Sequence, residues 1–157
     1  MRIGFIGLGN VGGKLANNLL NNQFDVIVLD KDKKITDEFE SNGCKVSKSI
    51  QDIVEKTDII VTCLPSPQVC ADVLESENGL IKNIRNDQIW IEMSTTDENQ
   101  LKRHASLIES KNAIALEAPV SGGCHRAATG NISIFVGGSR EGFEQALPVL
   151  KCLGRKI

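Results

Sequence analysis

One glycine-rich segment near the N-terminus constrains the possible folds of this chain most. Residues 2–7 form a short apolar stretch that ends in glycine, which is typical of a buried strand. Gly7, Gly9 and Gly12 then follow in GxGxxG spacing, and apolar residues recur at helical spacing from about Asn10 onwards. A strand, a glycine-rich turn and a helix in direct succession predict the first unit of a nucleotide-binding α/β fold.

The rest of the chain alternates strand-like and helix-like segments, which extends this prediction to the whole length. Short connections between such segments favour parallel strands with helices on both faces. We therefore predict an α/β fold, a doubly wound, mostly parallel sheet of the Rossmann type, with residues 1–157 as one dinucleotide-binding domain. A glycine-rich loop is expected after Pro119. The further predicted strands are 25–30, 44–46, 58–64, 88–93, 112–117 and 132–136, and the predicted helices are 35–42, 49–56, one that begins at Pro67, one that follows Asp97, and 141–153.

Composition and charge exclude several classes of function. The chain carries 18 Lys+Arg against 20 Asp+Glu, with five Phe, one Trp and no Tyr. A nucleic-acid binder needs a basic excess or stacking aromatics, and a membrane span needs about 18 consecutive apolar residues, so we expect neither. The five cysteines form no CxxC motif, and His104 and His125 stand apart from acidic clusters, so we expect reduced thiols and no metal site. Because the N-terminus reads as a strand, we expect a cytoplasmic protein, or a mitochondrial matrix protein if a transit peptide has been removed.

The three glycines and an acid at the end of the second predicted strand indicate a dinucleotide site. Gly7 would allow a tight turn, Gly9 would let the backbone approach a pyrophosphate, and Gly12 would let the helix lie close to the strand. The free N–H groups of the helix N-terminus would face the phosphates. Asp30 would accept hydrogen bonds from the ribose hydroxyls and repel a 2′-phosphate, so we expect NAD as the cofactor.

Two alternatives remain open on this motif. Lys31, Lys33 and Lys34 follow Asp30 and could attract a 2′-phosphate, which leaves NADP possible. Enzymes that use S-adenosylmethionine also combine a glycine-rich first loop with an acid at the second strand. A glycine-rich turn that holds no ligand is the structural alternative.

Three further loops should meet the glycine loop at one edge of the sheet, since ligands of open α/β sheets lie beyond the carboxyl ends of the strands. Residues 64–67, 94–96 and 119–123 each follow a predicted strand. They bring hydroxyl groups or bare backbone, which suits the nicotinamide half of a dinucleotide and a small polar substrate.

Two segments of the chain carry a family resemblance. The first is Gly4–Gly12 with Ala16, Asn18 and Leu19, and the second is Glu117–Gly123, continued by Ala127, Gly130–Asn131 and Val136–Gly138. They resemble the opening and substrate-loop signatures of the β-hydroxyacid dehydrogenases, and the resemblance covers the whole chain. It is nearest to the 3-hydroxyisobutyrate dehydrogenase branch, on the features Asp30 and Gly130–Asn131. It implies the N-terminal cofactor-binding domain of an oxidoreductase that transfers a hydride between NAD and a small 3-hydroxy acid such as 3-hydroxyisobutyrate.

The resemblance also implies roles for individual residues. Ser121 would position the substrate, whose carboxylate and hydroxyl would be held by Ser121, Gly122 and Gly123. His125 and Arg126 stand where the family has small residues, and we expect them to face solvent. The cofactor would be bound by Gly7, Leu8, Gly9, Asn10, Val11, Gly12, Asp30, Leu64, Pro65, Val69 and Thr95.

The end of the chain departs from the family. The resemblance places the catalytic lysine on the first helix of a following all-helical domain, but the chain stops at Ile157, and neither Lys151 nor Lys156 lies in a matching motif. We therefore expect this domain and its lysine to be absent here, so that the chain binds the dinucleotide and catalyses poorly or not at all. The complete protein is expected to be a homo-oligomer.

Other functions stay open at this point. They are a non-catalytic dinucleotide-binding or sensing module, an NADPH-dependent semialdehyde reductase of the same family, and a transferase that uses S-adenosylmethionine.

Overall fold

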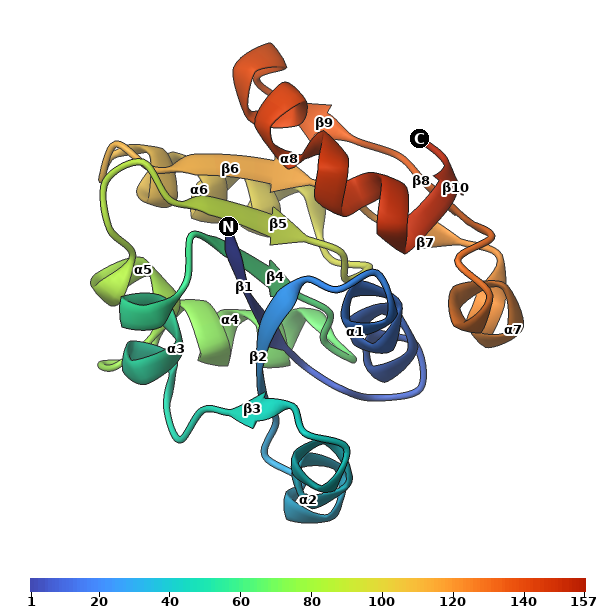
Figure 1. The fold of residues 1–157 in the computed structure, drawn as a ribbon. Coiled ribbons are helices and arrows are strands. Elements are labelled where there is room, and N and C mark those ends of the chain that lie inside the picture. Colours follow the sequence, from blue (N-terminus) through green and yellow to red (C-terminus); the bar gives the residue numbers. More distant parts are fainter.

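A seven-stranded sheet forms the centre of the computed structural model, which describes residues 1–157. Its strand order is β3-β2-β1-β4-β5-β6-β9, and every neighbouring pair is parallel except β6 and β9. Figure 1 shows the strands fanning out between two layers of helices. The fold class predicted from the sequence is therefore confirmed. The strands are β1 (Arg2–Ile6), β2 (Asp25–Leu29), β3 (Lys45–Val46), β4 (Ile59–Thr62), β5 (Ile89–Glu92), β6 (Ile114–Glu117) and β9 (Gly137–Gly138).

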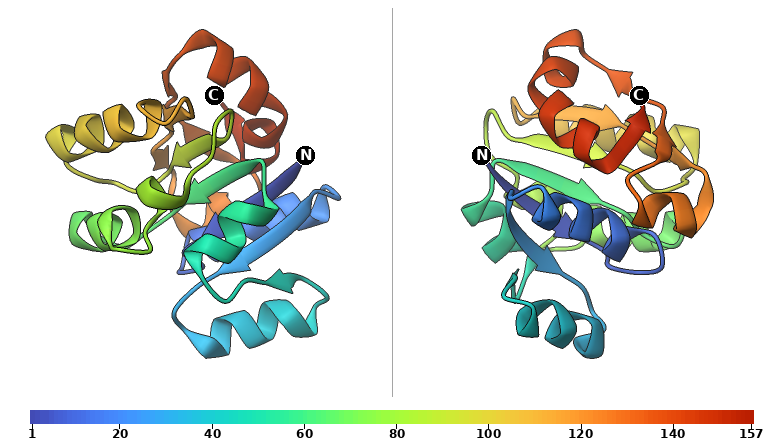
Figure 2. Two further views of the ribbon diagram at one scale, coloured as in Figure 1. Left: turned by 90° about the vertical axis from the view of Figure 1, so that its left-hand side faces the viewer. Right: turned by 45° about the vertical axis from the view of Figure 1, so that its right-hand side comes forward.

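Eight helices cover the sheet, and the contacts between them divide most of them into two layers. On one face α1 (Gly12–Asn21) contacts α7 (Gly123–Ala128) and α8 (Arg140–Leu153). On the other face α3 (Ile50–Lys56), α4 (Pro67–Glu75), α5 (Leu80–Asn83) and α6 (Glu98–Glu109) contact one another, while α2 (Lys33–Ser41) packs beside β3. The left view of Figure 2 shows the sheet between the two layers.

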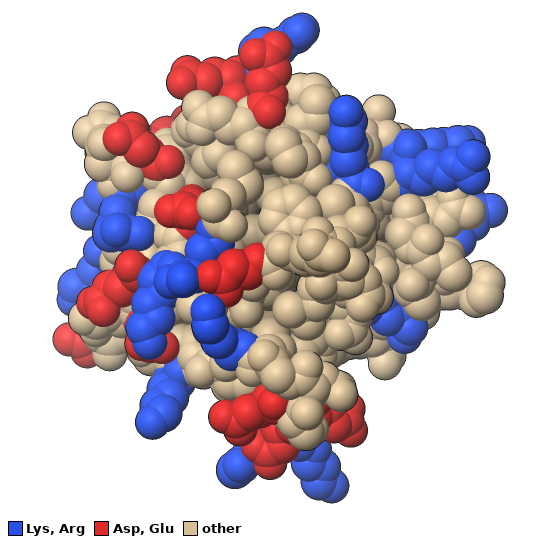
Figure 3. Space-filling model, in the orientation of Figure 1, with Lys and Arg blue, Asp and Glu red and all other residues tan.

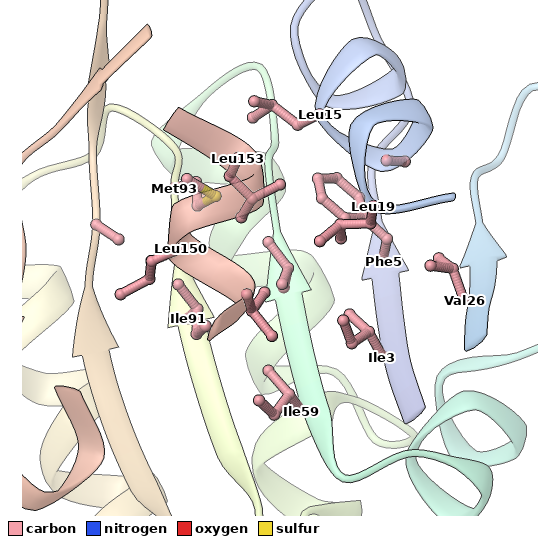
Figure 4. Close-up of a cluster of buried hydrophobic side chains, with 14 of the residues drawn as sticks. Ile3, Phe5, Leu15, Leu19, Val26, Ile59, Ile91, Met93, Leu150 and Leu153 are labelled. Carbon is pink, nitrogen blue, oxygen red and sulfur yellow. The ribbon is translucent and has the colours of Figure 1, made fainter. Parts of the chain in front are cut away.

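The core residues alternate between the two faces of the sheet, as the pleat of a strand requires. Ile3 and Phe5 of β1 pack under α1 and α8, together with Leu15 and Leu150 (Figure 4). Trp90 of β5 points the opposite way, into the cluster formed by α3 to α6. Both faces of the sheet are therefore buried, which explains why its strands read as nearly continuous apolar runs.

The C-terminal third differs from the sequence prediction in its strands. The predicted strand 132–136 exists as β8 (Ile132–Ile134), but it lies in a separate three-stranded sheet with β7 (Val120–Ser121) and β10 (Gly154–Lys156). The expected glycine-rich loop contains β7 and α7. The seventh strand of the main sheet, β9, is made of two glycines and was not predicted, because glycines carry no apolar pattern.

The ends of the helices depend on caps and local sterics. α2 begins at Lys33, two residues before the predicted start, because the Asp32 carboxylate accepts a hydrogen bond from the Lys34 backbone at 2.9 Å. Ser49 caps α3 and Pro67 opens α4, as predicted. α8 continues through Pro148, whose side chain is exposed, so that the carbonyl left without its helical donor can face water.

None of the helices combines the length and the apolar character that a membrane crossing requires. No group of three His, Cys, Asp or Glu side chains is arranged to hold a metal ion.

Candidate functional site

A cleft of about 880 Å³ lies beyond the carboxyl ends of the central strands. At this edge β1 is followed by the glycine loop, β2 by Asp30, β4 by Cys63 and β5 by Met93. A space of this size suits an extended cofactor or drug-sized ligand. Of the residues predicted to bind a cofactor or substrate, the cleft is lined by Gly7, Gly9, Asn10, Val11, Gly12, Asp30, Leu64, Pro65, Val69, Thr95 and Gly123.

The three glycines of the loop meet three different steric demands. Gly7 has a φ of +96°, and a Cβ there would lie 2.3 Å from the Cys63 carbonyl oxygen. A Cβ on Gly12 would lie 2.0 Å from the Gly7 carbonyl oxygen, so only glycine lets α1 start this close to β1. A Cβ on Gly9 would meet no protein atom within 4 Å. Two glycines are thus required by the protein itself, whereas Gly9 borders open space, which suits a close approach by a ligand.

The Asp30 carboxylate is fixed by two backbone donors. Its Oδ2 accepts a hydrogen bond from the N–H of Leu8 at 2.6 Å, and its Oδ1 accepts one from the N–H of Asp32 at 2.8 Å. Each carboxylate oxygen can accept a second hydrogen bond, so Asp30 can still receive two hydroxyl groups of a ligand. Leu8 itself is buried and does not line the cleft, so its part in the site is this backbone link.

The far end of the cleft is formed by the loops after β4 and β5. The backbone N–H of Leu64 donates to the Ser94 hydroxyl at 2.7 Å, which ties the two loops together. Leu64, Pro65 and Thr95 line this end. Cys63 also lines it, and burial raises the pKa of its thiol to about 12, so the sulfur is a neutral packing group and not a nucleophile.

The predicted substrate loop only partly reaches the cleft. Val120 and Gly123 line it, while Ser121 and Gly122 are exposed and lie outside the lining. Gly122 and Gly123 have φ values of 136° and 75°, so the chain turns from β7 into α7 through two conformations that favour glycine. The loop therefore stands at the mouth of the cleft with its backbone bare.

The side chains of α7 that depart from the family, His125 and Arg126, are exposed. The aliphatic part of the Arg126 side chain packs over Gly122, so that a Cβ on Gly122 would lie only 2.8 Å from the Cδ of Arg126. Neither residue lines the cleft.

Sequence reasoning missed one side of the cleft. Lys48, Ser49 and Ile50 line it from the connection between β3 and α3. Ligands of open α/β sheets lie beyond the carboxyl ends of the strands, and this applies to β3 as well. The end of β3 was overlooked because the strand has only two residues and no motif follows it. Of the three lysines after Asp30, Lys31 lines the cleft, whereas Lys33 pairs with Asp37 at 2.9 Å outside it.

Comparison with known proteins identifies the family. Residues 2–157 match the NAD binding domain of 6-phosphogluconate dehydrogenase. The chain belongs to this family of NAD-binding domains. Mitochondrial 3-hydroxyisobutyrate dehydrogenase of Mus musculus is 36% identical over 155 residues, covering 99% of this chain and 46% of that protein. The NAD-dependent L-serine dehydrogenase of Pseudomonas aeruginosa is 31% identical and is covered to 52%.

Solved structures agree with the sequence relatives. A structure described as Mycobacterium tuberculosis 3-hydroxyisobutyrate dehydrogenase with L-serine superposes with a TM-score of 0.90 at 29% identity, covering 99% of this chain and 53% of that one. The resemblance to the N-terminal domain of the β-hydroxyacid dehydrogenases is thereby confirmed. The NAD-binding domain described here spans about half the length of the curated relatives it matches.

The residues present fit NAD. Gly9 borders open space that a ligand can approach closely, the N-terminus of α1 faces the cleft at Gly12, and Asp30 has spare acceptor capacity. Apolar side chains of Ile35, Val69 and Val73 provide walls for flat rings.

Proposed function

We propose that this chain is the cofactor-binding half of an NAD-dependent dehydrogenase that acts on a small 3-hydroxy acid. The observation that carries the proposal is the single cleft that joins Asp30, the glycine loop and Thr95 to Gly123 of the substrate loop. Such a cleft brings a dinucleotide next to a site for a small anion. Relatives named as 3-hydroxyisobutyrate dehydrogenases support the substrate class.

The residues of the chain would bind and orient the cofactor. Asp30 would accept hydrogen bonds from the adenosine ribose, and the loop from Gly9 to Gly12 would face the pyrophosphate with backbone N–H groups. Leu64, Pro65 and Val69 would pack against the nicotinamide half and exclude water from it. The dinucleotide, when bound, supplies the hydride chemistry.

The substrate loop would hold a 3-hydroxy acid through Ser121 and the backbone N–H groups of Gly122 and Gly123. Residues 118–139 contain no Asp or Glu, so nothing in this segment repels a carboxylate. On the face shown in Figure 3, acidic and basic side chains mix at the left, top and bottom, and the centre is largely uncharged. The right-hand edge, which carries α7 and β10, shows basic side chains without acidic ones. This charge distribution suits an anionic substrate.

The general base would come from outside this chain. The lysines that line the cleft are Lys31 and Lys48, and both lie at the Asp30 end, away from the Ser121 loop. We propose that a lysine of a second, all-helical domain takes the hydroxyl proton, with residues 1–157 as the dinucleotide-binding domain.

A second candidate is an NADPH-dependent semialdehyde reductase. Lys31 and Lys48 border the part of the cleft where a 2′-phosphate would lie, which favours this reading, whereas the Asp30 carboxylate opposes it. A non-catalytic binding module differs from both by lacking a base in the complete protein.

The complete enzyme is further proposed to be a homo-oligomer in the cytoplasm. The mitochondrial matrix is the alternative, because the relatives in mouse and rat are named mitochondrial. Light scattering of the full-length protein gives the oligomeric state.

The first test is a fluorescence titration of the chain with NADH and with NADPH at fixed ionic strength. We expect NADH to bind more tightly, while tighter binding of NADPH would favour the reductase. The substrate class is tested in a chimera that joins residues 1–157 to the remaining half of a relative, assayed on a panel of 3-hydroxy acids, with Ser121→Ala as the matched variant. A chimera that binds NADH but oxidises none of the panel, while the parent relative does, would contradict the proposal.

A further inference from the structure

A buried carboxylate without a cationic partner lies beneath the far end of the cleft. Glu92, the last residue of β5, is 1% exposed and forms no ion pair. A buried acid is normally paired with a cation, since an isolated charge in the interior is costly. The burial of the Glu92 carboxylate without a cation therefore needs an explanation other than packing.

The hydrogen bonds around Glu92 are all donated to it. The Ser94 backbone N–H donates to Oε1 at 2.7 Å, and the Thr62 hydroxyl donates to Oε2 at 3.0 Å. The indole N–H of Trp90 donates to the Thr62 oxygen at 2.9 Å. Because an indole N–H can only donate, Thr62 uses its own proton toward Glu92, and the chain of donors runs in one direction. This arrangement is complementary to a carboxylate.

The same hydrogen bonds shape the far end of the cleft. Glu92 joins Thr62 of β4 to Ser94 after β5, and Ser94 in turn holds the N–H of Leu64. Leu64 and Thr95, which belong to the two connected loops, both line the cleft. The carboxylate is thus part of the support of both loops that we assign to the nicotinamide half.

We propose that Glu92 is a positioning residue whose buried negative charge favours the oxidised, positively charged nicotinamide ring over the reduced, neutral one. The inference rests on the proposed function, since the function places the ring at the Leu64–Thr95 end. NAD⁺ and NADH share their adenosine and pyrophosphate groups, so the ratio of their affinities reports how the protein interacts with the nicotinamide ring in its two oxidation states. A negative charge nearby lowers the free energy of the cation alone.

The ionisation of Glu92 sets the pH at which this preference exists. Burial raises the pKa of Glu92 above the usual range for a glutamate, and the hydrogen bonds from Ser94 and Thr62 oppose this. Burial raises the pKa of the Cys63 and Cys70 thiols, and the nearby charge of Glu92 raises it further. On the neighbouring strand β6, Glu117 lies opposite Glu92 in the sheet register and is exposed. On α6, His104 pairs with Glu75 and its ring faces Trp90.

The test measures the affinities of the 157-residue chain for NADH and NAD⁺ as a function of pH. Trp90 is the only tryptophan, so its quenching by NADH reports binding, and NAD⁺ is measured by competition. We expect the ratio of NAD⁺ to NADH affinity to be highest at high pH and to fall as the pH drops through the pKa of Glu92. Glu92→Gln should lower the ratio by at least about threefold at high pH and make it independent of pH.

Thr62→Val is the matched variant that keeps the charge but removes one donor. We expect it to weaken both forms by the same factor, to keep the ratio at high pH, and to move the inflection to higher pH. If Glu92→Gln left the ratio of NAD⁺ to NADH affinity unchanged, Glu92 would have a role in packing only and the inference would be overturned. A ratio that does not change with pH in the wild-type chain would overturn it as well, and that measurement does not depend on any variant folding. Failure of both cofactor forms to bind would overturn the proposed function together with the inference.

Discussion

The Asp30 carboxylate holds the backbone N–H of Leu8 at 2.6 Å, so the acid at the end of β2 is attached to the glycine loop at the end of β1. One side chain therefore serves the cofactor site twice, since it sets the position of the loop and leaves acceptor capacity toward the cleft. This double role links binding and local stability at a single residue.

Replacement of Asp30 should consequently affect both properties. We expect Asp30→Ala to weaken NADH binding about tenfold to a hundredfold, because hydrogen bonds to a charged acceptor are lost. It should also lower the free energy of unfolding by about 1–2 kcal/mol, since the Leu8 N–H loses its partner. Fluorescence titration and urea denaturation measure the two effects. Asp37→Ala, on an exposed carboxylate outside the cleft, is the control and should change neither by much.

The two glycines Gly9 and Gly12 should separate binding from folding. Gly12→Ala places a methyl group 2.0 Å from a backbone oxygen, and we expect a loss of about 3 kcal/mol or more in unfolding free energy. Gly9→Ala meets no protein atom, so stability should change by less than about 0.5 kcal/mol while NADH affinity falls at least about tenfold. If Gly9→Ala bound NADH as well as the wild-type chain does, the assignment of the loop to the pyrophosphate would be wrong.

Lys48 should influence the choice between NADPH and NADH. It lines the cleft on the Asp30 side, so Lys48→Ala should weaken NADPH by about threefold to tenfold at low salt and NADH by less. Lys34→Ala is the matched control, because Lys34 is exposed and lies outside the cleft. Parallel titrations at two salt concentrations measure the effect. Equal losses for the two cofactors would place the 2′-position elsewhere.

Stability should depend on acid pH through Glu75. Arg103 and His104 hold the pKa of this carboxyl at about 2, below the ordinary value of 4.5. Its folded pKa is lowered, so the stabilisation is complete above the unfolded pKa and is lost as the pH falls from about 5 toward 2. Solvent screens the partly exposed group, so we expect a contribution of about 1 kcal/mol.

Urea denaturation across this range measures the Glu75 contribution. The slope of stability against pH should flatten in Glu75→Gln. Glu98→Gln, which removes an exposed pair with Lys102, should leave the slope nearly unchanged. The assignment fails if Glu75→Gln keeps the full acid dependence.

The sequence predicted the fold where the apolar pattern is strong. The runs that became β1, β2, β4, β5 and β6 were recognised because both faces of these strands are buried. β9 went unrecognised because its two glycines carry no pattern. Gly138, which pairs with Leu116 of β6, has a φ of 139°, and a Cβ there would lie 2.9 Å from the Ala115 carbonyl oxygen, so this position favours glycine. The smaller sheet likewise depends on distant pairings, such as Val120 with Ile134.

The candidate site was predictable to a similar degree. Glycine spacing identified the loop, and the ends of parallel strands pointed to Asp30, Leu64 and Thr95. Lys48 was missed because the strand before it is too short to show a pattern. The network around Glu92 was missed because its members come from β4, β5 and the loop after β5, and no local spacing joins them.

By itself, the sequence determined the elements whose information is local: the strands with continuous apolar runs, the Ser49 cap of α3, and the turn that needs Gly7. Only the tertiary structure decided which strand ends share a cleft, that Ser121 stands at its mouth, and that Glu92 is buried without a cation. The physical reason is that burial and electrostatic environment arise from residues far apart in the chain. They exist only after the sheet has brought those residues together.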